Sequence, residues 1–333
     1  MTYMPGAICI TDHLETADSK DLSDAIQAVI DANPNRTIWF PDGKYMLSKP
    51  ICTPADPTKS VDLVLSRYAI IKASPDWEGD EALVRLGGKN PYNSIGINGS
   101  NYSLTGGIID GSGVANGISI DSGRETRIQD CSIKYTKVGI HIKRGANNGS
   151  SDADVLDVHI VGNGAPDSIG VLVEGYDNSF TNMRIANVQI GVYLKSGGNF
   201  LRHLHPLYTC DWTHYADSRG FLEDGFNNFY QNCYSDQFAV GFHTTHGRFS
   251  TFDSCFALWY SPKDGTHTAF RADGKFGSVL NNFNVGFAYF EPHNVVLSVG
   301  EDGGEGILQN PIIHGKMWDD QTHLDYLVGK VLG

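Results

Sequence analysis

A short unit that recurs about every 21 or 22 residues constrains the fold of this chain more than any other feature of its sequence. The unit is a glycine followed by an apolar residue, with a second apolar residue two positions further on. It begins at Gly117, Gly139, Gly170, Gly191, Gly220 and Gly241, with Ala269 as a weaker member. The successive intervals are 22, 31, 21, 29, 21 and 28 residues. A fixed period of this length is typical of repeat architectures, in which each unit packs on its neighbours.

A second apolar pattern precedes each unit, as in Phe180-x-x-Met183 and Phe252-x-x-Cys255. Each repeat therefore holds two short alternating strands, and no helical segment separates them as a βαβ unit would require. Coiling such a chain stacks strand on strand and pairs the backbone groups of neighbouring rungs. We predict an all-β chain, a right-handed parallel β-helix of about nine or ten rungs over residues 51–315. An antiparallel sandwich or a propeller is the alternative, and it predicts alternation of the hairpin type.

Residues 1–50 differ from the repeats and predict a cap on the N-terminal end of the solenoid. Residues 21–32 place apolar side chains on one stripe, which is a helical pattern. Residues 37–47 read as a strand, a Pro-Asp-Gly turn and a second strand, which predicts a hairpin. A helix and a hairpin would cover the apolar open end of the solenoid. Residues 316–333 are predicted to form a C-terminal cap or tail.

The net charge of −13 argues against a nucleic-acid partner, because nucleic acids reward clustered Lys and Arg. The same sign makes a neutral partner easier to bind than a polyanion. There is no run of 18 apolar residues and no secretory pattern at the N-terminus, so we expect no membrane contact and a cytoplasmic or virion-associated protein. The spacing of the six cysteines matches no metal or redox motif, so we expect reduced thiols in the core and no cofactor.

The long intervals mark insertions, and two of them fall at the same corner of the predicted coil. They cover residues 209–219 and 260–267, two rungs or about 10 Å apart, with the short corner 235–238 between them. Insertions on one face often mark a binding face, so we predict a cleft with Asp236 on its floor. The aromatic side chains of this corner are also typical of a subunit interface, and a homotrimer formed there is a second interpretation.

The acidic residues near this corner predict the chemistry of the cleft. Two carboxylates across a bond suffice for glycoside hydrolysis, and the candidates are Asp236, Asp211 and Glu223. An ordinary solvated carboxylate is the competing interpretation for each, most of all for Asp224, which precedes a glycine at a repeat turn. His203-x-His205 would suit a metal, but no third ligand is evident at solenoid spacing, so we predict none. The predicted substrate-binding residues are Trp212, Tyr208, His205, His214, Arg219, Trp259 and Tyr260.

The opening helix, residues 38–45 and the glycine-punctuated rungs together resemble the pectate-lyase-like β-helix superfamily. That group includes polygalacturonases, phage tailspike depolymerases, alginate epimerases and inulin fructotransferases, so the resemblance implies carbohydrate chemistry. Residues 108–113 look like an early Asp-Gly-x-Gly turn of polygalacturonases. The catalytic trio of those enzymes is absent, and no site residue is carried over.

We therefore predict a carbohydrate-active enzyme that cleaves or rearranges glycosidic bonds of a largely neutral oligo- or polysaccharide through a carboxylate pair. A polysaccharide lyase acting on a uronic-acid glycan is the first alternative. A non-enzymatic phage tail or surface module that binds glycans is the second.

Overall fold

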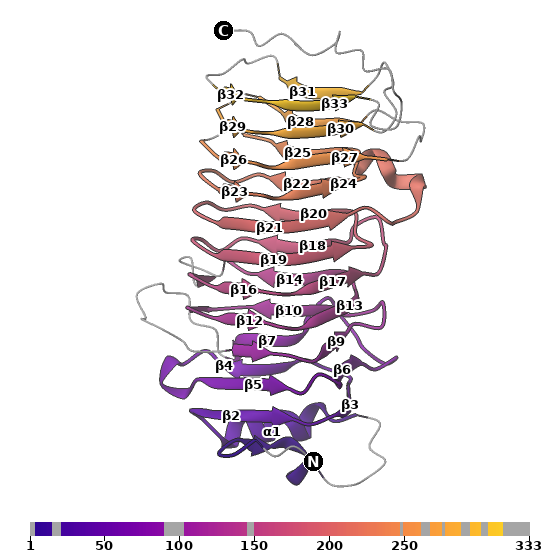
Figure 1. Cartoon of the computed structure of the whole chain (residues 1–333). Coiled ribbons are helices and arrows are strands. Elements are labelled where there is room, and N and C mark those ends of the chain that lie inside the picture. The colour runs from indigo at the N-terminus through magenta and orange to yellow at the C-terminus, as the bar shows by residue number, and fades with distance from the viewer. Residues whose placement is uncertain are drawn as a thin grey trace. The chain divides into compact units, whose positions relative to one another are not determined.

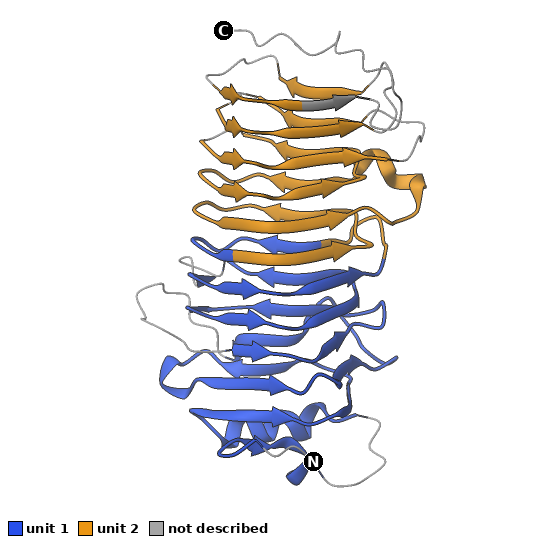
Figure 2. Ribbon diagram, viewed as in Figure 1, with its two compact units in different colours: residues 1–163, 170–179 blue, residues 164–169, 180–333 orange. Residues whose placement is uncertain are grey.

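The fold was determined from a computed structural model that forms two compact units. Unit 1 comprises residues 1–163 and 170–179, and unit 2 comprises residues 164–169 and 180–333 (Figure 2). Each unit is built of parallel strands, and the fold is the right-handed parallel β-helix predicted from the repeat. The residues that the structure describes are 4–14, 21–89, 103–144, 150–246, 249–260, 267–274, 277–287, 294–300 and 306–315.

The predicted N-terminal helix is present in unit 1 as α1, Ser23–Ala32. Its apolar stripe is buried, with Ile26 and Ile30 fully shielded from solvent. The amide of Gln27 exchanges two hydrogen bonds with the backbone of Cys52 in strand β4, Ile51–Pro54. Helix α1 is thus held against strand β4 by polar as well as apolar contacts. Among the described residues, no helix is long and apolar enough to cross a membrane.

The predicted hairpin is wrong, because its two strands belong to the solenoid. Strand β2 (Arg36–Phe40) pairs in parallel with β5 (Val61–Leu65), and β3 (Gly43–Leu47) pairs in parallel with β6 (Ala69–Ala73). The Pro-Asp-Gly segment is the corner between two strands of one rung. The coil therefore begins well before the glycine repeat is recognisable in the sequence.

A rung of unit 1 consists of three strands in two sheets. Strand β10 (Asn116–Ile120) lies in one sheet between β7 (Ala82–Lys89) and β14 (Val138–Ile142). The chain then enters the other sheet as β12 (Arg127–Gln129) and β13 (Ser132–Thr136). The remaining elements of this part of the chain are β1 (Ile8–Cys9), η1 (Ile10–Asp12), η2 (Pro57–Lys59), β8 (Ser103–Thr105), β9 (Ile108–Asp110), β11 (Gly123–Arg124), β15 (Ser150–Ser151), β16 (Asp154–Leu156), β17 (His159–Gly162) and β18 (Ile169–Val173).

Unit 2 repeats this plan, and Figure 1 shows its strands stacked rung by rung. One of its sheets is made of β20 (Ile190–Leu194), β22 (Arg219–Glu223), β25 (Val240–Thr244), β28 (Thr268–Ala272) and β31 (Val295–Val299), and we call it the Gly-strand sheet. Its other strands are β19 (Ser179–Ala186), β21 (Phe200–Leu207), β23 (Phe229–Gln231), β24 (Tyr234–Asp236), β26 (Thr251–Asp253), β27 (Phe256–Trp259), β29 (Val279–Asn281), β30 (Asn284–Phe287), β32 (Ile307–Gln309) and β33 (Ile312–Gly315).

The repeat residues form the interior of each rung, as the sequence predicts. Cys233 and Cys255 are fully buried, and the strands beside them pair in parallel with Tyr234 opposite Phe256. The repeat glycine is required by close packing, because a Cβ at Gly220 would lie 2.6 Å from the carbonyl oxygen of Gly241. The parallel, in-register pairing confirms the predicted orientation of these segments. The predicted C-terminal cap, residues 316–333, lies outside the described residues.

Candidate functional site

The insertion at residues 209–219 forms a short helix, η3 (Trp212–Asp217), whose aromatic side chains pack against their own rung. Tyr208 is 3% exposed, and its ring lies 5.5 Å from that of Phe238 in an edge-on contact. Tyr215 is buried beside it, with the ring of Trp212 4.2 Å away. The prediction that Tyr208 binds substrate is therefore wrong, because this side chain builds a small core under the insertion.

Trp259, the last residue of strand β27, is likewise buried, with 2% of its surface exposed. The Trp259 indole N–H donates to the Phe238 carbonyl oxygen at 2.7 Å, and the ring stacks against His267. The prediction that Trp259 binds substrate is therefore also wrong. Tyr260 is 48% exposed and His214 is exposed, so both remain available to a ligand, whereas residues 261–266 of the second insertion lie outside the described residues.

The three predicted acids do not meet in one cleft. Asp211 caps η3 and accepts hydrogen bonds from the Thr213 backbone N–H and hydroxyl. Glu223 points into the interior, is 2% exposed, and accepts a hydrogen bond from the Tyr230 hydroxyl at 2.7 Å. Burial raises the pKa of Glu223, and the hydrogen bonds to its carboxylate oppose that shift only in part. The predicted carboxylate pair is therefore not formed by these residues.

Asp236 is the last residue of β24 and is 6% exposed. Its Oδ2 is 3.4 Å from Nε2 of His205, and Nη1 of Arg184 is 2.6 Å from Nδ1 of the same ring. Arginine can only donate, so Nδ1 accepts and the ring proton faces Asp236. Tyr234 stacks on His205 at 4.2 Å. We call Arg184, His205 and Asp236 the Asp236 ladder.

One oxygen of the Asp236 ladder has an unusual environment. The Oδ1 atom of Asp236 is buried and has no hydrogen-bond partner within the described part of the chain. A buried acceptor without a partner is costly, so such an atom marks either a strained structure or a site for a donor from outside the chain.

A second arrangement of the same kind, not predicted from the sequence, lies on the Gly-strand sheet. Nε of Arg219 donates to Nδ1 of His243 at 3.1 Å, and Nε2 of His243 is 2.7 Å from Oδ2 of Asp273. Arg271 donates to the other oxygen of Asp273 at 2.7 Å. We call Arg219, His243 and Asp273 the His243 ladder. Of its members, only Arg219 was predicted to contact substrate.

The charges of the His243 ladder follow from its surroundings. Burial lowers the pKa of His243, and Arg219 and Arg271 lower it further, although Asp273 acts in the opposite sense. Burial acts to raise the pKa of Asp273, but hydrogen bonds from Arg271 and His243 outweigh it and the pKa is lowered. At neutral pH the ladder therefore holds a neutral imidazole beside an ionised carboxylate.

A second carboxylate, Asp224, follows strand β22 on the same sheet. Its Oδ2 accepts a hydrogen bond from the Tyr193 hydroxyl at 2.8 Å, and its Oδ1 accepts one from Thr245. Burial acts to raise the pKa of Asp224, but these hydrogen bonds lower it overall. Glu223, Thr244 and Ala272 are in register on adjacent strands, so Asp224 and Asp273 lie two strand spacings, about 9.6 Å, apart along the sheet. From the sequence alone, Asp224 is indistinguishable from an ordinary solvated carboxylate at a turn.

Unit 1 carries a polar row on its own sheet, in which the charges neutralise one another. Asp121 accepts from Arg85 at 2.8 Å and lies 3.2 Å from the Lys143 ammonium. His141 lies 3.0 Å from Glu174. Within the described ranges, no group of three or more His, Cys, Asp or Glu residues is arranged to hold a metal ion.

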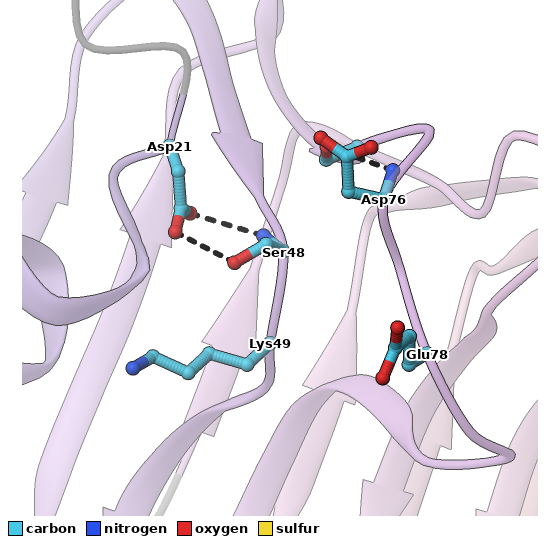
Figure 3. A pocket seen from close by; sticks show the side chains of 6 residues that line it. Asp21, Ser48, Lys49, Asp76 and Glu78 are labelled. Carbon is cyan, nitrogen blue, oxygen red and sulfur yellow. Dashed lines mark hydrogen bonds between the residues drawn. The ribbon is translucent and has the colours of Figure 1, made fainter.

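Unit 1 also has a hollow of about 520 Å³ near the start of α1 (Figure 3). The Asp21 carboxylate there accepts two hydrogen bonds from Ser48. Burial acts to raise the pKa of Asp21, but the hydrogen bonds from Ser23 and Ser48 bring it down to about 2. Lys49 pairs with Asp24 at 2.7 Å. Asp21 and Lys49 in this hollow are therefore engaged in contacts with neighbouring side chains of the same chain, and these contacts stabilise the local structure. The residues that line the hollow are Asp21, Ser48, Lys49, Ser74, Asp76 and Glu78.

The family model that describes rhamnogalacturonase A/epimerase, pectate lyase-like proteins matches residues 13–204, which is more than half of the sequence. The chain belongs to this family. The match covers most of unit 1 and ends in β21 of unit 2. No curated protein sequence matches the chain.

Solved structures share the fold at low sequence identity. An endo-xylogalacturonan hydrolase from Aspergillus tubingensis is 15% identical, with a TM-score of 0.61 and 93% of each chain covered. A tailspike of E. coli bacteriophage HK620 is 12% identical, with a TM-score of 0.70 over 93% of this chain and 63% of the tailspike. ORF18 of Geobacillus virus E2 is 14% identical, with a TM-score of 0.59 over 92% of this chain and 60% of that protein. The chain therefore spans less than two thirds of the two viral proteins.

Proposed function

We propose that this chain is a carbohydrate-active enzyme that cleaves or rearranges glycosidic bonds, with its reaction centre on the outer face of the Gly-strand sheet of unit 2. A carbohydrate-active function in general is supported by the family match and by the neighbours, among them an alginate lyase from Paenibacillus and a tailspike in complex with a pentasaccharide. The two viral neighbours support virion association as a further part of the proposal.

The observation that carries the proposal is the neutral imidazole of His243 between Arg219 and Asp273, with Asp224 on the same sheet. A neutral imidazole can accept a proton from a reacting group at neutral pH, and the carboxylate of Asp273 fixes its orientation. Nδ1 of His243 accepts a hydrogen bond from Arg219. Arg219 must therefore turn toward the substrate before Nδ1 of His243 can act as a base. Asp224 supplies an ionised carboxylate that can stabilise positive charge developing on a sugar ring.

The substrate class follows from the charge of the chain and of the site. A net charge of −13 opposes a highly anionic polymer, and carboxylates such as Asp224 suit the hydroxyl groups of a neutral glycan. A lyase reaction on a uronic-acid glycan is the second candidate. The observation that favours it is local: Arg219 and Arg271 place two cations beside a neutral imidazole, as a base acting next to a sugar carboxylate requires.

The Asp236 ladder is the competing location for the reaction centre. It shares the order Arg, His, Asp with the His243 ladder, and Oδ1 of Asp236 lacks a partner within the described residues. It offers a single carboxylate, however, whereas Asp224 and Asp273 supply two on one sheet. For that reason we assign the reaction to the Gly-strand sheet.

The test measures turnover of a panel of neutral and uronic-acid polysaccharides, with reducing ends and unsaturated sugar products followed separately. We expect His243→Gln to lower kcat on the order of 10²-fold or more, as loss of a general base does. Asp224→Asn should also lower kcat on the order of 10²-fold, because it removes the carboxylate that stabilises charge developing on the sugar ring. Asp211→Asn is the matched control, because asparagine also caps η3, and it should retain activity.

Each outcome decides between the locations. Loss of activity in Asp236→Asn alone would move the centre to the Asp236 ladder and refute the assignment to the Gly-strand sheet. Unsaturated products would select the lyase reaction. Binding without turnover by the unmodified chain on every substrate would show a glycan-binding module and refute the enzyme.

A further inference from the structure

Four phenylalanines of unit 2 are exposed on three successive rungs at one corner of the coil. Phe200, Phe226, Phe229 and Phe249 expose 51%, 43%, 37% and 77% of their surface. Phe200 and Phe229 begin β21 and β23, pair in register, and stack at 4.9 Å with nearly parallel rings. Phe226 lies three residues before Phe229, and Phe249 lies two residues before Thr251, the partner of Phe229 in the next rung. We call these four residues the aromatic corner.

The fold itself does not require apolar side chains here. The row that begins with Phe200 and Phe229 continues along unit 2 through Thr251, Val279 and Ile307, each the first residue of its strand. Ile307 is also 53% exposed.

The corresponding first residues in unit 1 are polar. They are Ser103, Arg127 and Asp154, the first residues of β8, β12 and β16, and they pair with one another in register. The same structural position is thus polar in unit 1 and largely apolar in unit 2, so the aromatic side chains serve something other than the stacking of rungs.

The exposed area is large enough to support association. With about 200 Å² for each large apolar side chain, the aromatic corner and Ile307 expose roughly 500 Å². That is at the upper end of the largest apolar patch of an ordinary monomer. Two such surfaces in contact bury roughly 1,000 Å², about the minimum for a specific protein–protein interface.

The size of the patch favours a second copy of the chain as its occupant. Phe200 and Phe229 stack one rung apart, and Phe226 and Phe249 stand in the corners that precede strands β23 and β26. Two copies of this patch in contact bury about the area that a specific interface needs. We propose that the aromatic corner is the surface through which copies of the chain associate side by side.

The aromatic corner is a different surface from the subunit interface predicted from the sequence. That prediction placed a homotrimer interface at the insertion corner, because of its aromatic residues. Tyr208, Tyr215 and Trp259 are buried within their own chain, so they offer little surface to a partner. The aromatic corner involves neither the His243 ladder nor the Asp236 ladder, so the proposal is independent of the proposed reaction.

The test is sedimentation velocity over the micromolar range with the full chain. We expect the unmodified chain to sediment as a multiple of 36.3 kDa. The double variant Phe200→Thr/Phe229→Thr should sediment as the monomer. Threonine stands in the same row at Thr251, so the rungs accept it there, and circular dichroism and Tm should not change. Tyr68→Thr is the control, because Tyr68 is 68% exposed in unit 1 and should leave assembly intact.

A second variant guards against misfolding of the first. Phe249 has a left-handed φ of 56°, a conformation that asparagine adopts readily, so Phe249→Asn should fold normally. We expect it to raise the Kd of association about tenfold or more. A monomeric unmodified chain at all concentrations would overturn the proposal and leave the surface to a different protein. Unchanged assembly of folded Phe200→Thr/Phe229→Thr would overturn it as well.

Discussion

Replacement of Glu223 by glutamine should stabilise the chain at neutral pH, although it removes a charged residue from unit 2. Glu223 is buried in the interior, where Tyr230 and Ser250 donate hydrogen bonds to its two oxygens. Neither partner carries a positive charge, so ionisation of the carboxyl group is not compensated by a cation among these contacts. Glutamine has the shape of the protonated acid and can use the same two hydroxyl groups.

The magnitude follows from proton linkage. Burial raises the folded-state pKa of Glu223 above its ordinary value of 4.5, so the folded chain binds this proton more tightly than the unfolded chain. The stabilisation that protonated Glu223 contributes to the folded chain is therefore fully present below pH 4.5. It is lost as the pH rises toward the folded-state pKa of Glu223. The loss is at most about 1.4 kcal/mol per pH unit. Above the folded-state pKa the difference between the two proteins should level off.

The assay is thermal and urea denaturation of Glu223→Gln and the unmodified chain at intervals from pH 4 to pH 8. The two proteins should be nearly equal at pH 4, and the variant should gain an advantage as the pH rises. Asp211→Asn is the control, because Asp211 is exposed and should show no such divergence. Parallel stability curves at all pH values would refute the argument that an uncompensated carboxyl is buried at this position.

Three further predictions concern unit 2. Asp211→Ala should lower the free energy of unfolding by about 0.5–2 kcal/mol in denaturation experiments, because it removes the cap of η3, and an unchanged stability would contradict the cap. Cys233 and Cys255 should resist a thiol reagent until the chain unfolds, because both are fully buried and burial raises the pKa of Cys255. Rapid modification of these two thiols in the native chain would contradict this prediction. The acid limb of the pH–activity profile should lie below pH 6.5, because the pKa of His243 is lowered from that value, and a limb above it would exclude His243 as the base.

The fold was predictable from the sequence because one motif repeats in the same sense. Stacked rungs need the same inward side chains at each turn, so the repeat reports the pairing of distant strands. The hairpin error shows the limit of this signal. Pro41-Asp42-Gly43 is equally suitable for a hairpin turn and for the corner of a rung, and only the parallel pairing of β2 and β3 with later strands distinguishes the two.

The insertions were located correctly, but their aromatic residues were misinterpreted. An insertion rich in Tyr and Trp predicts a sugar-binding surface and a small covering core equally well, because both need flat apolar side chains. Tyr208 and Trp259 belong to the core because their rung turns them onto Phe238. Two of the exposed phenylalanines, Phe200 and Phe229, stand instead at strand starts, where no insertion draws attention to them.

The position of a residue within the repeat indicates whether its side chain faces the interior or the outer face, which its place in an insertion does not. The fourth residue of each unit points inward, as Ile142 and Leu194 do, and Glu223 occupies that position. The third residue alternates to the outer face, and His243 occupies that position. Aligning the units would therefore have placed Glu223 inside and His243 outside without a structure. What the sequence does not contain is the convergence of Arg219 and Asp273 on His243, because they are 24 and 30 residues away from it and insertions of unequal length separate the rungs.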